Sequence, residues 1–358
     1  MKDIIFELSA EPYGSFSDRL DNLTKKFRNK LKTLNLGLVH LVGARAYLSD
    51  ASNQLENLKT HPLYTEMLSQ GAFSYVEQPS LNGSKISLMA WMTDDEIERS
   101  GSPEKRVVTC HGSRQLFQSI RFTAEEAAGM TPKEQTVEAF KRHQVWLEEQ
   151  GLSLSEHCMR TWLFVRDIDT NYQEVVEGRN DVFCACGLTS KTHYIASTGI
   201  GGNGANTAAV CVDFWSVDDQ DLQVKYLQAL DHLNPTHEYG VAFERGTSFT
   251  SDGVQRILIS GTASIDRAGN CIFQGDVLKQ TERLFENISY LLADGGCSLE
   301  EIKSMNVYLR DLSDYEPVKM YLDEHFPNVA RVISWAPVCR PLWLIETECI
   351  VSRNVGHS

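Results

Sequence analysis

The 358-residue sequence has no long apolar run and no leader-like start. No stretch approaches the ~18 consecutive apolar residues that a transmembrane helix needs. The first residues, Met-Lys-Asp-Ile-Ile-Phe-Glu, have neither the hydrophobic segment nor the small-residue cleavage site of a signal peptide. We therefore expect a cytoplasmic protein that does not associate with membranes.

The cysteines do not form a pattern that predicts disulfides or a metal site. There are nine of them, an odd number, and they are scattered along the chain, which fits reduced thiols. Only Cys184 and Cys186 lie close together, as C-x-C, and no second pair follows to complete a zinc site. We expect no structural metal and no cofactor.

Basic residues are scarce relative to acidic ones. The chain has 34 Lys and Arg against 48 Asp and Glu, a formal net charge of −14. Nucleic acid is therefore not an expected partner, because phosphate binding requires a basic surface. A small anionic ligand is compatible with this charge only if several arginines cluster at its binding site and locally outweigh the negative charge of the chain.

The sequence contains an internal repeat. Residues 135–140 (Gln-Thr-Val-Glu-Ala-Phe) recur as residues 280–285 (Gln-Thr-Glu-Arg-Leu-Phe), an offset of 145 (280 − 135). Residues 151–156 recur at the same offset as residues 296–301, and both copies contain Ser-x-x-Glu, which predicts a helix cap. Agreement at several helix and strand ends favours a duplicated unit.

A third, more divergent copy is predicted at the N-terminus. An apolar stripe predicts a helix, and residues 72–76 and 85–92 are expected to form a hairpin turning at Asn82-Gly83. We therefore predict an α+β fold of three units, residues 1–104, 105–225 and 226–358. Each would have a mixed sheet with helices on one face. The helical stripe consists of Phe16, Leu20, Leu23, Phe27 and Leu31.

The candidate site lies on a predicted strand at residues 342–351. Alternation places Glu346 and Glu348 on one face, whereas the other face is apolar and suited to burial. Paired carboxylates on an interior strand are costly unless they have a function. Arg331, fifteen residues upstream (346 − 331), is a predicted partner across a hairpin. The alternative is an ordinary solvent-exposed strand face.

The corresponding strands of the other two units do not carry such a pair. Residues 207–215 and 85–92 lack two alternating carboxylates, and neither unit has a clear counterpart of Arg331. If these strands are buried, only the third unit is equipped for chemistry.

A set of motifs runs from residue 243 onward: residues 243–246 (Phe-Glu-Arg-Gly), 258–261 (Leu-Ile-Ser-Gly), 280–296 and 307–312, with Arg331 and Glu346. In these motifs the chain resembles the Rid family of reactive-intermediate deaminases. The resemblance implies that Arg331 binds a substrate carboxylate and that Glu346 takes part in proton transfer. Family members are typically trimers with active sites between subunits, so three units in one chain imply an intramolecular pseudo-trimer.

Two further segments resemble the chorismatase branch, also called pteridine-dependent dioxygenase-like proteins. They are residues 194–202 (Tyr-Ile-Ala-Ser-Thr-Gly-Ile-Gly-Gly) and residues 338–341 (Val-Cys-Arg-Pro). This resemblance implies cleavage of the enolpyruvyl ether of chorismate to pyruvate and a dihydroxycyclohexadiene carboxylate or a hydroxybenzoate. Two positions depart from the small deaminases: Phe243 replaces a tyrosine, and Lys319 stands where a shorter polar residue is common.

Enamines and enolpyruvyl ethers pose the same chemical problem. Hydrolysis begins when the terminal carbon of an electron-rich C=C is protonated, so the protein must supply a proton and hold a neighbouring carboxylate. Glu346 is the predicted general acid, since burial beside Glu348 would raise its pKa. Glu348 is the reserve candidate. The predicted substrate-binding residues are Arg331, Arg340, Cys339, Thr198, Gly199, Arg179 and Arg245, whereas Arg160 is expected only to cover a strand edge.

Three functions stay open at this point. The first is a chorismatase-like enzyme, the second an enamine or imine deaminase, and the third a non-catalytic binder of an anionic metabolite. The sequence is compatible with a monomeric pseudo-trimer or with a small homo-oligomer.

Overall fold

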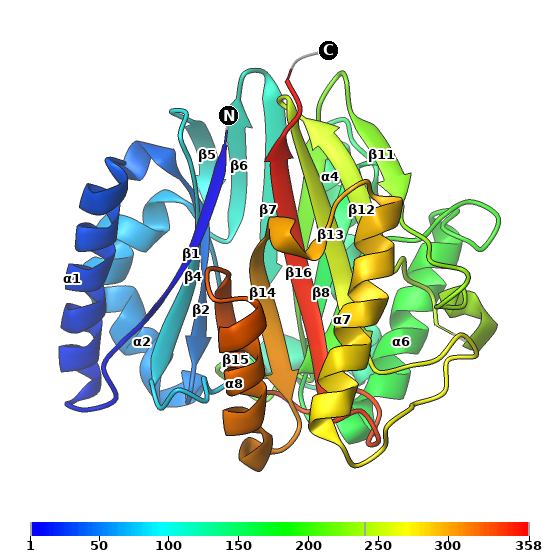
Figure 1. Cartoon of the computed structure of the whole chain (residues 1–358). Helices are drawn as coiled ribbons and strands as arrows, with labels where there is room; N and C mark the ends of the chain where they lie inside the picture. The colour runs from blue at the N-terminus through cyan, green and yellow to red at the C-terminus, as the bar shows by residue number, and fades with distance from the viewer. Residues whose placement is uncertain (1, 240, 357–358) are drawn as a thin grey trace.

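A computed structural model describes residues 2–239 and 241–356 of the chain. It contains three β-sheets, with helices packed against the outer face of each (Figure 1). The predicted α+β class is therefore confirmed. Among the described residues, no helix is long and apolar enough to cross a membrane.

The first sheet has four strands and is covered by one long and one shorter helix. Its order is β1-β4-β2-β3, and β3 pairs parallel with β2. The hairpin predicted from residues 72–92 is therefore wrong, because β4 inserts between β1 and β2. The elements are β1 (Asp3–Ser9), α1 (Phe16–Leu34), β2 (Leu41–Leu48), α2 (Ala51–Thr60), β3 (Ala72–Glu77) and β4 (Ile86–Thr93).

The second sheet has six strands in the order β5-β6-β7-β10-β8-β9. Its strands are β5 (Glu98–Ser102), β6 (Lys105–Cys110), β7 (Ser113–Ile120), β8 (Cys158–Val165), β9 (Ala196–Gly201) and β10 (Val210–Asp218). Its helices are α3 (Ala124–Ala127), α4 (Pro132–Glu149), α5 (Leu154–His157) and α6 (Ile168–Ala185).

The third sheet repeats this plan in the order β11-β12-β13-β16-β14-β15. Its strands are β11 (Gln223–Tyr226), β12 (Gly246–Ser251), β13 (Val254–Ala263), β14 (Ile302–Leu309), β15 (Ala330–Trp335) and β16 (Ile345–Asn354). Its helices are α7 (Val277–Asp294) and α8 (Tyr315–His325).

Four consecutive strands of each sheet, ending at one edge, share one order and one pairing pattern. In every case two antiparallel pairs are followed by one parallel pair at the edge. The second and third sheets add two strands at the opposite edge. The unit boundaries at 104/105 and 225/226 stay a prediction: β5 precedes the first boundary and β11 straddles the second, yet both strands pair with the sheet that follows.

The repeated Ser-x-x-Glu motifs cap short helical turns, as predicted: Ser153 caps α5, and Ser298 forms a capping box with Glu301.

The long repeated helices α4 and α7 have caps of their own. At α4, Thr131 and Glu134 form a reciprocal capping box and Pro132 occupies the first turn. At α7, the Asp276 side chain accepts from the backbone N–H of Lys279. The apolar stripe of α7, which includes Leu284 and Ile288, is fully buried against its sheet. Burial of this stripe fixes which face of the sheet turns outward.

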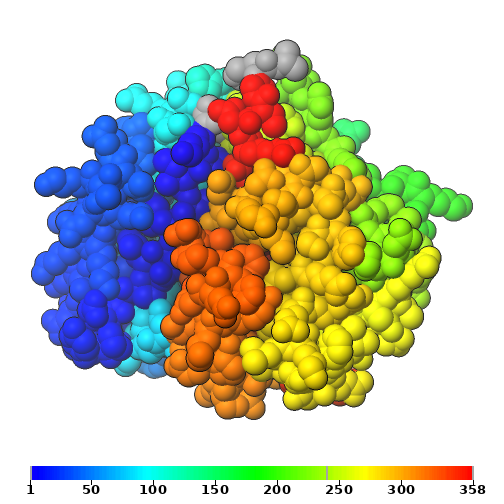
Figure 2. All heavy atoms as spheres, viewed as in Figure 1, coloured from blue at the N-terminus to red at the C-terminus, as the bar shows by residue number. Residues whose placement is uncertain are grey.

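The opposite faces of the three sheets turn toward one another around a central axis. Tyr47, Phe164 and Tyr308 occupy equivalent positions on β2, β8 and β14, and all three belong to one buried cluster. The space-filling view shows the N-terminal unit in blue lying directly against the orange third unit (Figure 2). The contacts between units therefore bury the inner faces of the sheets, which would be exposed in an isolated unit.

Candidate active site

Glu346 and Glu348 lie on the inner face of β16. Their residues are only 3% and 4% exposed, so the alternative of a solvated strand face is wrong. Glu346 pairs with Tyr308, and Glu348 pairs with Asn306, on the neighbouring strand β14. The predicted alternation therefore places both carboxyl groups between units.

Glu348 is held as an anion by donors from two units. Its Oε2 accepts from Arg160 Nη2 at 2.7 Å and from the Thr198 hydroxyl at 2.5 Å. Its Oε1 accepts from Trp162 Nε1 at 2.8 Å and from Asn306 Nδ2 at 2.7 Å. Burial acts to raise the pKa of Glu348, but the positive charges of Arg160 and Arg45 and these hydrogen bonds outweigh it and lower the pKa.

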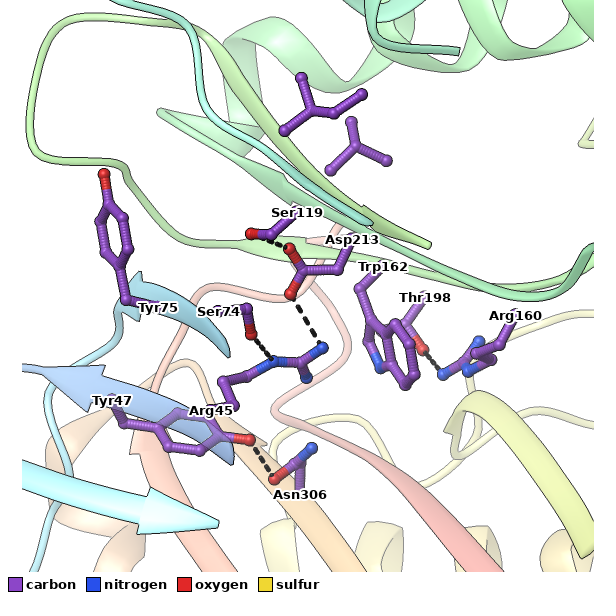
Figure 3. Close-up of polar contacts among 12 residues, drawn as sticks. Arg45, Tyr47, Ser74, Tyr75, Ser119, Arg160, Trp162, Thr198, Asp213 and Asn306 are labelled. Carbon is purple, nitrogen blue, oxygen red and sulfur yellow. Dashed lines mark hydrogen bonds and ion pairs between the residues drawn. The ribbon is translucent and has the colours of Figure 1, made fainter. Parts of the chain in front are cut away.

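Arg160 is a component of this network and not a surface residue. It is 1% exposed and also donates to the hydroxyl of Thr198, as the close-up shows (Figure 3). The expectation that Arg160 merely covers a strand edge is wrong. It fails because β8 is covered on its inner face by the third unit, a fact of packing that one strand sequence does not contain.

Glu346 has the opposite environment. The described residues donate no hydrogen bond to its carboxyl group. Burial, followed by the negative charge of Glu348, raises its pKa to about 8, and the charge of Arg160 only partly opposes this. Gly261 on β13 makes room for the group, since a Cβ there would collide with Oε1 of Glu346. At neutral pH this side chain is therefore a protonated acid.

The Glu346 carboxyl group lines a cavity of about 30 Å³ between the second and third units. This is room for about two water molecules. Six other predicted site residues line the same cavity, so the structure brings together seven of the nine. They are Glu346, Thr198, Gly199, Arg179, Arg245, Cys339 and Arg340.

Three arginines approach this cavity from different segments. Arg179 comes from α6 and is 2% exposed, whereas Arg245 precedes β12 and is 7% exposed. The two guanidinium groups lie 6.0 and 5.7 Å from the ring of Phe243. Arg340 is exposed and sits on the loop before β16. The site is therefore locally cationic in a chain of net charge −14.

Tyr172 is a lining residue that the sequence did not reveal. Its ring lies over Gly199, where a Cβ would stand 2.8 Å from Cε2 of the tyrosine. Burial, followed by the charge of Cys339, raises the Tyr172 pKa well above its usual value, so it stays a neutral phenol. On α6 it looked like any residue of an amphipathic helix, and only its position opposite the third unit brings it into the cavity.

Cys339 is a neutral thiol in this cavity. Burial, followed by the negative charge of Glu346, raises its pKa to about 12. A thiol with this pKa is a poor nucleophile. Cys339 therefore shapes the cavity.

Arg331 lies elsewhere, and its predicted pairing with Glu346 is wrong. Its guanidinium contacts Asp323 and donates to the carbonyl of Phe326 at 2.7 Å. The reason is topological: β14 separates β15 from β16, so the two strands do not form a hairpin. Arg331 is in register with Met305 on β14, and Met305 is in register with Cys349 on β16. Cys349 packs toward the helices, on the face opposite to Glu348, so Arg331 belongs to that face of the sheet.

A second buried carboxylate network lies between the first and second units. Asp213 on β10 pairs with Arg45 at 3.0 Å and accepts from the Ser119 hydroxyl at 2.8 Å (Figure 3). It also pairs with Arg121 at 2.8 Å. Burial acts to raise the pKa of Asp213, but the two arginines lower it overall. Asp213 is therefore also a fixed anion.

Comparison with known proteins identifies both the unit and the arrangement of units. The family model for endoribonuclease L-PSP matches residues 247–352. A RutC family protein of Pyrococcus abyssi is 36% identical over 100 residues, which are 27% of this chain and 79% of that protein. The 3-aminoacrylate deaminase RutC of Acinetobacter baylyi is 29% identical over 102 residues, 28% of this chain and 78% of that protein.

The whole chain has the fold of a solved chorismatase. The two structures have a TM-score of 0.67 and 19% sequence identity, and the match covers 87% of this chain and 93% of that one. The pseudo-trimeric arrangement of tandem units is therefore confirmed. Together with the sequence match, this shows that the chain belongs to the Rid (endoribonuclease L-PSP) family and has the chorismatase-like fold.

Proposed function

We propose that the protein cleaves the enolpyruvyl ether of chorismate, with Glu346 as the general acid. The observation that carries this proposal is the contrast between the two carboxyl groups. Glu348 receives four hydrogen bonds and stays anionic, whereas Glu346 receives none from the described residues and has a pKa of about 8. Such a separation provides a proton donor at neutral pH.

The first step transfers the Glu346 proton to the methylene carbon of the enol ether. The C=C electrons form the new C–H bond, and the ether oxygen stabilises the resulting oxocarbenium ion. The Glu346 carboxylate then stabilises this cation and can accept a proton from the attacking water. Collapse of the hemiketal then forms the ketone of pyruvate, breaks the C–O bond to the ring and passes the hydroxyl proton to the departing ring oxygen, which leaves as the ring alcohol.

The arginines suit a dianionic substrate. Each carboxylate of chorismate needs a cationic partner, and a guanidinium group can hold a carboxylate through two parallel hydrogen bonds. Arg340, Arg245 and Arg179 all line the cavity together with Glu346, and they come from three different segments. We assign the enolpyruvyl carboxylate to Arg340 and the ring carboxylate to Arg245 and Arg179.

A six-membered ring needs more room than the present cavity of about 30 Å³ provides. The segment 336–344 carries Cys339, Arg340 and Trp343 and has no regular secondary structure. Movement of this segment on binding would enlarge the cavity without disturbing β13 or β16. Closure over the substrate would also remove water from the acid.

The direct test is incubation of the purified protein with chorismate while pyruvate is followed with a coupled dehydrogenase. We expect catalytic pyruvate release that is lost in Glu346→Gln. Absence of pyruvate from wild-type protein under all tested pH values would contradict the proposal. A thermal shift by chorismate without turnover would instead favour the non-catalytic binder.

Deamination of an enamine or imine is the second candidate, favoured by the 3-aminoacrylate deaminase among the relatives. The same acid could protonate an enamine carbon. The position of Arg331, away from Glu346, argues against the carboxylate pairing that this family resemblance implies. Ammonia release from 2-aminoacrylate without pyruvate release from chorismate would support the second candidate.

A further inference from the structure

Two hairpin turns and the end of β4 meet at one end of the molecule, far from Glu346 in the fold. Asp95 follows β4, and Cys110 and His111 stand at the β6–β7 turn. One ligand atom from each of the three lies within 4.8 Å of the others. Nε2 of His111 is 3.2 Å from Oδ2 of Asp95. Thiol, imidazole and carboxylate are the donor types that zinc prefers.

The turn that carries His111 is fixed in the geometry that aims its ring. His111 has a φ of +48°, in the left-handed region, and is followed by Gly112 with a φ of +91°. This backbone turns the imidazole back toward Asp95, although its side chain is 55% exposed. A histidine in this conformation is uncommon, which makes the position worth explaining.

A second observation comes from the β12–β13 turn of the third unit. Asp252 is only 9% exposed, and its Oδ2 has no hydrogen-bond partner among the described residues. A buried carboxylate oxygen without a partner is costly. Asp252 and Cys110 line the same small cavity of about 10 Å³. The two turns are joined by a 2.6 Å hydrogen bond between Ser113 and Ser251.

The charge around this cavity favours a cation. Arg256 also lines it, but its guanidinium is paired with Asp3 through contacts of 2.7 and 2.9 Å. Asp252 therefore contributes negative charge to this cavity that Arg256, already paired with Asp3, only partly offsets. Tetrahedral ligands on zinc lie roughly 3.3–3.8 Å apart, so a contraction of about 1 Å would bring the ligand atoms of Asp95, Cys110 and His111 to that spacing.

We infer that Asp95, Cys110 and His111, with Asp252 as the fourth ligand, form a binding site for a zinc-type divalent cation. On coordination the Cys110 thiol releases its proton to solvent and binds as thiolate. The site would join all three units, since Asp95 lies in the first, Cys110 and His111 in the second, and Asp252 in the third. Cysteine spacing predicted no metal site. It cannot reveal this one, because the ligands come from three separate turns and only one of them is a cysteine.

The test uses Co²⁺ as a spectroscopic substitute for Zn²⁺ on the reduced, chelator-treated full chain. We expect a thiolate-to-cobalt charge-transfer band in the near ultraviolet that saturates at a single ion per chain and disappears on addition of Zn²⁺. Cys110→Ser should abolish the band. His111→Asn, which keeps a residue that tolerates positive φ, should weaken Co²⁺ binding at least about tenfold.

The matched control is Cys184→Ser, since Cys184 is an exposed thiol on α6 outside the proposed site. This variant should bind Co²⁺ as the wild type does. Asp252→Asn should weaken binding without removing the charge-transfer band. A band that survives Cys110→Ser, or wild-type protein that gives no band with excess Co²⁺, would overturn the inference. If Cys110→Ser does not fold, the response of the exposed His111→Asn decides.

Discussion

The inner strands β16, β10 and β4 occupy the same place in the three sheets but carry different polar groups. The position of Glu346 is held by Cys211 on β10 and by Ser87 on β4, each opposite the equivalent aromatic residue. The position of Glu348 is held by Asp213 and Met89 in the same register. Two units therefore have a buried carboxylate that is paired with arginine, and only one has a second, unpaired acid.

This comparison separates a structural role from a chemical one. Glu348 and Asp213 are both anions held by guanidinium groups from another unit, so each joins two units. Glu346 has no counterpart and receives no hydrogen bond from the described residues. We therefore expect loss of Glu346 to affect turnover and loss of either paired carboxylate to affect stability.

The largest expected effect is on Glu346. Glu346→Gln should lower pyruvate release by about 10²–10⁴-fold, because the amide cannot donate the proton that general acid catalysis requires. Binding of chorismate, measured by calorimetry, should change little because Gln is isosteric. Activity of this variant close to that of wild type would remove the contrast with Glu348.

The paired carboxylates provide the matched stability experiment. Glu348→Ala and Asp213→Ala should each lower the free energy of unfolding by about 3–5 kcal/mol, since each leaves a buried arginine without its partner. Urea unfolding monitored by tryptophan fluorescence measures this. A cost below about 1 kcal/mol for Asp213→Ala would show that the two networks are not equivalent.

Gly261 tests whether the acid needs its present position. Gly261→Ala places a methyl group against Oε1 of Glu346, so we expect kcat to fall about tenfold with a small change in Tm. Gly37→Ala is the control, because its added methyl group would meet only Val39 at 3.9 Å. Equal kcat in the two variants would contradict a positional role for Gly261.

The smallest expected effect is a shift in the pH profile. The proton donor is present below its pKa of about 8, so the rate should be constant below this pH and fall about tenfold per unit above it. Glu348→Gln removes a negative charge that raises this pKa, so the alkaline limb should move to lower pH by about one unit. A limb that stays in place would show that burial alone sets the pKa.

Much of the fold was predictable because its signals are local. The Ser-x-x-Glu motifs and the apolar stripe of α1 fix helix starts and a buried helix face within one unit, and the structure confirms them. The N-terminal hairpin was predicted wrongly. A turn signal at Asn82-Gly83 does not specify which strand becomes the neighbour, and β4 pairs with β1 and β2.

The sequence by itself determined the alternation that puts Glu346 and Glu348 on one face. It also indicated which glycine and arginines line the cavity with Glu346. Only tertiary structure decided which carboxyl group is the acid, since Arg160, Trp162 and Thr198 reach Glu348 from another unit. It also removed Arg331 from the site, because β14 lies between its strand and β16. Alternation and capping depend on neighbours in the chain, whereas protonation depends on charges brought together across a seam.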